Sequence, residues 1–135
     1  MAYTTEQLRM ASLFAELSDE SLERIKETVN EFDAPAGALL VQPGAEAQGL
    51  YIICNGTVAV ETRGAGTIEL GPGESVGELA LLTPTTRSAR VSAKTPVHGL
   101  AIDRGDFTRI LESEPRIAIS LLGVLARRLI DTSAR

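Results

Sequence analysis

The 135 residues carry 44% hydrophobic and 23% charged side chains and a formal net charge of -5, as expected for one globular domain that buries its own core. The acidic balance argues against binding to a nucleic acid backbone, which needs a clustered basic face, and a single cysteine excludes an internal disulfide framework. Because no signal peptide and no apolar run near the roughly 20 residues that span a bilayer is present, we expect a cytoplasmic protein without membrane insertion.

Residues 1–31 carry the signals of two short helices. Thr4 and Gln7 have the spacing of a capping box, which predicts a helix through about Ser12. A second helix is predicted to begin near Ser18, where two acidic residues follow the cap. Its apolar side chains recur at spacings of three and four: Leu22, Ile25 and Val29.

Between residues 32 and 102, short apolar segments alternate with glycine, proline and asparagine, which is typical of strands joined by turns. Six strands are predicted: Leu39–Val41, Leu50–Cys54, Thr57–Glu61, Thr67–Leu70, Ala89–Ala93 and Val97–Ile102. The pair Asn55 and Gly56 is a signal for a tight hairpin turn. This spacing predicts a compact antiparallel barrel or roll.

The most informative stretch, residues 77–91, interrupts these strands with the sequence Gly-Glu-Leu-Ala-Leu-Leu-Thr-Pro-Thr-Thr-Arg-Ser-Ala-Arg-Val. A short helix here would direct backbone amides and its positive end toward an anion. The Arg87 guanidinium offers paired donors to phosphate oxygens, and Ser88 can add a hydroxyl donor. Glu78 would repel a phosphate, so it is suited to accept from a hydroxyl of the neighbouring sugar. These residue types indicate a pocket for a sugar phosphate.

Helical signals return between residues 103 and 135. Asp103 is a cap for a helix through about Leu111, and Pro115 suits the first turn of a last helix that runs to about Ser133. An apolar seam with alternating spacings follows that helix: Ala118, Leu122, Leu125, Leu129 and Thr132. A second apolar row runs beside it: Ile117, Leu121 and Val124. We therefore expect one side to cover the roll and the other to meet a second copy of the chain, although a helix packed wholly within the monomer stays open.

At residues 77–91 the chain resembles the cyclic nucleotide-binding domain family, whose phosphate-binding cassette opens with Gly-Glu-Leu/Ile-Ala-Leu and closes with Arg-Ser/Ala/Thr-Ala. The resemblance covers nearly the whole chain. We therefore expect residues 1–135 to form a single domain. The resemblance implies an α+β fold in which an antiparallel, jelly-roll-like β-roll is flanked by N-terminal helices and a long C-terminal helix. It also implies that Arg87 binds the cyclic phosphate, that Glu78 binds the ribose 2'-hydroxyl, and that Ser88 is a second phosphate donor.

The resemblance extends to the last helix. In the bacterial catabolite activator type this helix pairs with its twin across a two-fold axis, and a late Thr-Ser pair contacts the adenine. Counting from Arg87, with landmarks at Pro115 and at residues 126–129, that pair falls on Thr132 and Ser133. A hydroxyl can accept from an adenine amino group or donate to a ring nitrogen. The alternative is a frayed polar helix end without function.

The expected ligand site combines the cassette with the last helix: Gly77, Glu78, Leu79, Arg87, Ser88, Ala89, Thr132 and Ser133. No nucleophile with a base partner, carboxylate pair or metal-ligand spacing can be assembled from the sequence, so we expect binding rather than catalysis, without cofactor or metal. His98 is predicted to be structural, and Cys54 a buried, inert thiol. Three positions depart from the family pattern: the turn at residues 43–46 lacks an aspartate that many relatives carry, Ser75 stands where an aromatic is commoner, and Arg90 replaces a small residue. Arg90 is expected to point into solvent because strand side chains alternate.

The expected function is an allosteric sensor that binds cAMP and signals through the last helix of a homodimer to a separate effector protein. No direct DNA binding is expected, because the sequence ends at Arg135 without the helix-turn-helix that follows this helix in transcriptional relatives. A cGMP-selective receptor stays open, since a hydroxyl at Ser88 can also approach a guanine amino group. A ligand-free dimerisation or docking module is a further alternative, and a cyclic phosphodiesterase is the weakest.

Overall fold

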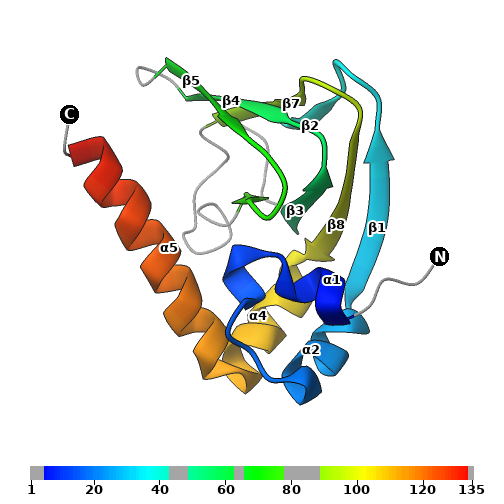
Figure 1. The fold of residues 1–135 in the computed structure, drawn as a ribbon, viewed down its shortest axis with the longest axis vertical. Coiled ribbons are helices and arrows are strands. Elements are labelled where there is room, and N and C mark those ends of the chain that lie inside the picture. The colour runs from blue at the N-terminus through cyan, green and yellow to red at the C-terminus, as the bar shows by residue number, and fades with distance from the viewer. Residues whose placement is uncertain (1–4, 43–48, 63–65, 78–88, 134–135) are drawn as a thin grey trace.

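The computed structural model describes residues 5–42, 49–62, 66–77 and 89–133. Two four-stranded antiparallel sheets form a roll, the shorter helices gather at one end of it, and the long last helix extends past them along one side (Figure 1). This arrangement is the α+β β-roll with N-terminal helices and a long C-terminal helix that the sequence predicts.

The N-terminal region folds into α1 (Thr5–Arg9), the 3-10 helix η1 (Ser12–Phe14) and α2 (Asp19–Lys26). The first helix is shorter than predicted, because Ser12 belongs to η1 and not to α1. The predicted start of the second helix is confirmed, since the Ser18 side chain accepts a hydrogen bond from the Ser21 amide at 3.2 Å. Thr4 of the predicted capping box lies outside the described residues, and so does the Gln7 side chain.

Strand β1 (Val29–Ala34) lies where the sequence predicts the end of the second helix. The apolar spacing that ends at Val29 fits a helical face, but α2 stops at Lys26 and Val29 is buried as the first residue of a strand. The long antiparallel register between β1 and β8 (Val97–Asp103) provides backbone pairing for this segment. Tertiary pairing therefore overrides a local helical pattern, and the roll begins earlier than the predicted boundary at residue 32.

The other strands agree with prediction to within a residue at each end, except that a short one was missed. The first sheet has the order β1, β8, β3 (Gly49–Asn55) and β6 (Ser75–Val76). The second sheet has the order β2 (Leu39–Val41), β7 (Ala89–Ala93), β4 (Val58–Thr62) and β5 (Gly66–Leu70). The missed strand, β6, has two residues and is too short to show a period.

Two hydrophobic cores lie on opposite faces of the first sheet. The core between this sheet and the helices includes Leu13, Phe14, Leu50, Ile52, Leu100, Ile102, Phe107, Ile117 and Leu121. The core inside the roll consists of Ala34, Val41, Ile53, Val58, Val76, Val91, Ala93 and Val97. Because strand side chains alternate, neighbouring residues such as Ile52 and Ile53 belong to different cores.

The turn at Asn55 and Gly56 is not the predicted hairpin. It joins β3 of the first sheet to β4 of the second, and these two strands do not pair with each other. The chain instead crosses between sheets against the turn before β8, where the Lys94 amide donates to the Thr57 carbonyl at 2.9 Å. Gly56 has φ +96°, and any side chain there would collide with the Pro96 carbonyl.

The C-terminal helices α4 (Arg104–Ser113) and α5 (Pro115–Ser133) confirm the predicted boundaries closely. Asp103 caps α4 by accepting from the Asp106 amide at 2.8 Å. Between the two helices, Glu114 accepts from the Ser21 hydroxyl at 2.6 Å and from the Arg24 guanidinium at 2.7 Å, which ties the start of α5 to α2. No helix in the described part of the chain combines the length and hydropathy needed to cross a membrane.

Candidate functional site

The cassette connects the two sheets of the roll. Gly77 directly follows β6, which pairs with β3 at Tyr51 and Val76 in the first sheet. Ala89 opens β7, which pairs with β4 in the second sheet. The residues between these two ends lie outside the described part of the structure, including Glu78, Leu79, Arg87 and Ser88. The described frame therefore fixes where the cassette leaves and re-enters the roll.

The exit from β6 depends on a glycine. Gly77 has φ +96°, a left-handed conformation in which side-chain-bearing residues are strained. It lets the chain turn out of the strand as soon as Val76 has been buried in the roll core. Glycine is therefore favoured at the opening of the motif because the backbone there adopts a left-handed conformation.

The strand before the cassette carries a buried polar residue. Ser75 is only 2% exposed and stands where the resembled family more often has an aromatic. Its partner in β3 is Ile52, and the neighbouring pair is Tyr51 and Val76. The small hydroxyl therefore occupies a packed position on the side of the first sheet that carries Ile52.

An aromatic pair supports the interior of the roll beside this strand, and sequence reasoning missed it. The rings of Phe32 and Tyr51 meet edge to face with centroids 5.4 Å apart, and both pack against the roll core. Phe32 can approach closely because Gly99 lies opposite it, where an added Cβ would come within 2.7 Å of the ring. The sequence signal was weak, since the pairing depends on β1, a strand that the sequence analysis did not predict.

The strand after the cassette alternates as expected. Val91 is buried in the roll core, Ala89 is half-buried, and Arg90 is exposed, as predicted. Arg90 lies directly opposite Glu61 in the register of β4 and β7, a favourable cross-strand arrangement of opposite charges. Arg90 therefore faces away from the roll interior.

The last helix carries the remaining expected site residues at its end. Thr132 and Ser133 are the final helical positions of α5, and their side chains lie outside what the structure describes. Closer to its start, Ile117 and Leu121 are fully buried against the helical core. Ile117 and Leu121 belong to the second apolar row of the sequence prediction. They form the buried face of α5, which packs on the helices below the roll.

The opposite face of α5 is exposed and apolar. Four large side chains on it are 65% to 67% exposed: Ile119, Leu122, Leu129 and Ile130. Leu122 and Leu129 belong to the predicted seam, whereas two other members, Ala118 and Leu125, are half-buried. With the exposed Ala126 between them, positions 119, 122, 126 and 129 keep spacings of three and four. The exposed seam is therefore rotated slightly from the predicted one.

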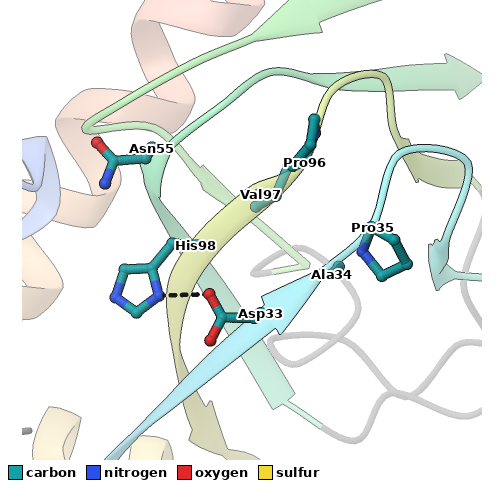
Figure 2. Close-up of a pocket in the computed structure, with 7 residues that line it drawn as sticks. All are labelled: Asp33, Ala34, Pro35, Asn55, Pro96, Val97 and His98. Atoms are coloured by element: carbon teal, nitrogen blue, oxygen red, sulfur yellow. Dashed lines mark hydrogen bonds and ion pairs between the residues drawn. The ribbon is translucent and has the colours of Figure 1, made fainter.

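His98 and Cys54 lie on β8 and β3, outside the cassette. The His98 Nδ1 is 2.9 Å from the Asp33 carboxylate, and its Nε2 is 3.9 Å from that of Glu31 (Figure 2). Cys54 is half-buried rather than fully buried, and burial raises the pKa of its thiol, with a smaller contribution from the charge of Glu31. Within the described ranges, histidine, cysteine and carboxylate side chains form no group suited to a metal ion.

The chain belongs to the cyclic nucleotide-binding domain family, whose profile matches residues 31–114. That range contains most of the roll, the cassette and α4. The family is a regulatory domain rather than a catalytic one.

Individual relatives agree with this assignment. An uncharacterised NTE family protein of Mycobacterium tuberculosis is 34% identical over 123 residues, which is 90% of this chain and 21% of that protein. A cyclic nucleotide-gated potassium channel of Mesorhizobium japonicum is 36% identical over 106 residues, 78% of this chain and 29% of that protein. The crystal structure of Thermus thermophilus catabolite activator protein matches with TM-score 0.81 and 31% identity, covering 92% of this chain and 61% of that one. The chain thus spans less than a third of the length of these two curated relatives.

Proposed function

We propose that this domain is a receptor for a cyclic mononucleotide and that cAMP is its preferred ligand. Membership of the cyclic nucleotide-binding domain family supports the ligand class. The choice of adenine is supported by Thr132 and Ser133, which match the base-contacting pair of the catabolite activator type in sequence. The site uses no cofactor or metal, and the ligand leaves unchanged.

Different residues bind different parts of the ligand in this proposal. Arg87 neutralises the cyclic phosphate with help from Ser88 and the backbone amides that follow Gly77, while Glu78 accepts from the ribose 2'-hydroxyl. Thr132 and Ser133 contact the base from the end of α5. A guanidinium and a carboxylate are suited to these separate roles because only the cation gains from facing the phosphate.

The observation that carries this proposal is the position of the cassette in the fold. Gly77 directly follows β6 of the first sheet and Ala89 opens β7 of the second, so the chain passes from one sheet to the other between these two ends. The cassette residues thus belong to the connection between the two sheets rather than to a loop within one sheet.

Calorimetric titration with cAMP tests the site directly. Charge-assisted hydrogen bonds contribute roughly 1.5 to 3 kcal/mol each, so Arg87→Leu is expected to weaken binding by one to a few powers of ten. Arg90→Leu is the matched control, because it removes the same charge from an exposed position three residues away and is expected to bind like wild type. If Arg87→Leu also titrates like wild type, the assignment of the phosphate site is wrong.

Parallel titration with cGMP separates the remaining candidates. Tighter binding of cGMP would assign the receptor to the other purine, in which case Ser88 is the first residue to substitute. Absence of binding to either nucleotide, together with a tight dimer, would favour a ligand-free docking module.

Signalling requires the ligand to prefer one arrangement of α5 over another, since equal affinity for both shifts nothing. Thr132 and Ser133 lie at the far end of a helix whose start is held by buried Ile117 and Leu121. Binding the base therefore biases the exposed half of the helix and the contact it makes with a second copy. The recipient of the signal is a separate effector protein or a further domain, which is the arrangement that the much longer relatives suggest.

A further inference from the structure

The helices cover only part of the outer face of the first sheet. On β8, Leu100 and Ile102 point toward the helices and are buried, whereas His98, two residues earlier on the same face, is partly exposed. The same change occurs along β1, from buried Val29 to exposed Glu31 and Asp33. The sheet therefore presents a polar region where the helical layer ends.

A small cavity lies at this boundary. It has a volume of about 150 Å³. Its lining is Met10, Ala11, Glu31, Ile53, Cys54, Asn55, Pro72, Gly73, His98 and Leu100. Ligand pockets usually measure about 300–1,000 Å³, so this cavity is too small for a nucleotide or a drug-sized molecule and matches one aliphatic side chain.

A shallower trough of about 470 Å³ adjoins the cavity and shares Asn55 and His98 with it. Figure 2 shows its lining side chains, with His98 and Asp33 turned toward each other and Asn55 above them. Pro35 and Pro96 lie farther along it. We call the cavity and the trough together the groove.

The charge of the groove is negative. Glu31 and Asp33 alternate onto the same face of β1 and flank His98. Among the described residues that line the groove there is no lysine or arginine. The nearby Arg9 is engaged elsewhere, because its guanidinium is bonded to Asp19 and to the Leu17 carbonyl. Two carboxylates beside an apolar cavity are complementary to a cation carried next to an aliphatic group.

We propose that the groove docks a basic segment of a partner protein. One aliphatic side chain of that segment enters the cavity, and lysine or arginine side chains of the same segment lie over Glu31 and Asp33. The shape favours a peptide because a cavity sized for one side chain continues into an open trough. Since Glu31 and Asp33 are both exposed, each ion pair contributes little and binding is weak and salt-dependent.

The test uses the full chain saturated with cAMP and the peptide acetyl-Leu-Lys-Arg-Leu-Lys-amide, followed by amide chemical shifts in NMR. We expect saturable shifts in residues 31–33, 53–55 and 98–100. The variant Glu31→Gln with Asp33→Asn is expected to bind roughly fivefold more weakly, because two exposed ion pairs are lost. Glu20→Gln with Glu112→Gln removes the same charge from exposed positions of α2 and α4 and is expected to bind within about twofold of wild type.

The sole cysteine gives a second measurement at the cavity itself. A side chain in the cavity covers Cys54, so the peptide is expected to slow its alkylation, whereas a peptide with serine in place of both leucines is not. Equal weakening by the two double variants, shifts spread over the surface, or alkylation unaffected by the peptide would overturn the proposal. Shifts in the same residues that depend only on protein concentration would assign the groove to self-association and overturn it as well. If the protein does not bind cAMP, the same measurements can be made on the nucleotide-free protein. Failure of the proposed function is therefore distinguishable from failure of this proposal.

Discussion

Gly56 and Gly37 show how two residues with the same backbone conformation differ in what surrounds them. Their φ angles are +96° and +91°, so either would strain a residue with a side chain. Nothing lies within 4 Å of a Cβ added at Gly37, whereas one added at Gly56 would overlap the Pro96 carbonyl. The requirement for glycine is therefore conformational at Gly37 and both conformational and steric at Gly56.

Substitution by alanine separates the two contributions. Gly37→Ala is expected to lower the free energy of unfolding only by the cost of a left-handed residue, roughly 1–2 kcal/mol. Gly56→Ala is expected to lose clearly more, because the turn between the two sheets must also move. Urea unfolding of both variants measures the difference. Equal losses would show that the contact with Pro96 relaxes without cost.

The Cys54 thiol lies in the wall of the cavity and is held in its neutral form. Burial raises its pKa above the ordinary value of 9.0, and Glu31 raises it further. The native protein therefore keeps a proton that the unfolded chain releases as pH rises. This contribution to stability is fully present below the ordinary pKa and is lost as pH rises through the pKa of the folded state.

The reactivity of the thiol follows from the same shift. Its reaction with Ellman's reagent is expected to be slower in the native protein than in the urea-unfolded chain at mildly alkaline pH, with a midpoint displaced to higher pH. Glu31→Gln is expected to move that midpoint part of the way back, since it removes only the smaller cause. A native midpoint at or below that of the unfolded chain would contradict the assignment.

At the scale of elements, α5 has two differently held halves. Its start is fixed by the bonds of Glu114 to Ser21 and Arg24 and by the buried side chains of Ile117 and Leu121. Beyond residue 125 every described side chain is exposed. The second half can therefore respond to a ligand or partner without disturbing the core.

Deletion of residues 129–135 tests this division. The deletion removes the exposed Leu129 and Ile130 together with Thr132 and Ser133, so cAMP affinity is expected to fall by about tenfold or more while thermal unfolding of the roll is unchanged. The double variant Thr132→Ala with Ser133→Ala keeps the helix length and is expected to lose affinity in the same direction. Unchanged affinity in both would exclude the helix end from the base-binding site.

For the whole molecule, the exposed apolar seam of α5 is the main surface that the monomer leaves uncovered among the described helices. Ile119, Leu122, Ala126 and Leu129 repeat at coiled-coil spacing on the side opposite the buried face. Large contiguous apolar surfaces on a small domain mark interaction sites. Pairing of two copies along this seam would place the ends of both α5 helices at the same interface.

Sedimentation equilibrium measures this association. Wild type is expected to sediment as a dimer, and Leu122→Glu with Leu129→Glu as a monomer, because two buried charges on each helix would face each other across the seam. Ile68→Glu on β5 changes an exposed apolar residue outside the seam and is expected to remain dimeric. A monomeric wild type, or dissociation by Ile68→Glu as well, would contradict pairing through α5.

Local signals in the sequence predicted most of the fold. The caps at Ser18 and Asp103, the proline at the start of α5 and the alternation around Arg90 on β7 each depend on neighbours a few residues away, and the structure confirms them. The candidate site was predicted from a contiguous motif for the same reason. The structure describes only its ends, so the roles of Glu78 and Arg87 stay predictions.

Other features depend on contacts between distant segments. Val29 suits a helix or a strand, and only pairing with Ile102 decides for the strand. Asn55 and Gly56 predict a turn, but the packing of Gly56 against Pro96 directs the chain into a second sheet. The sequence by itself therefore determined the residue types of the cassette and the order of the elements, because these follow from local chemistry. Only the tertiary structure decided which face of α5 remains exposed and where the acidic groove forms, because both result from how far one layer covers another.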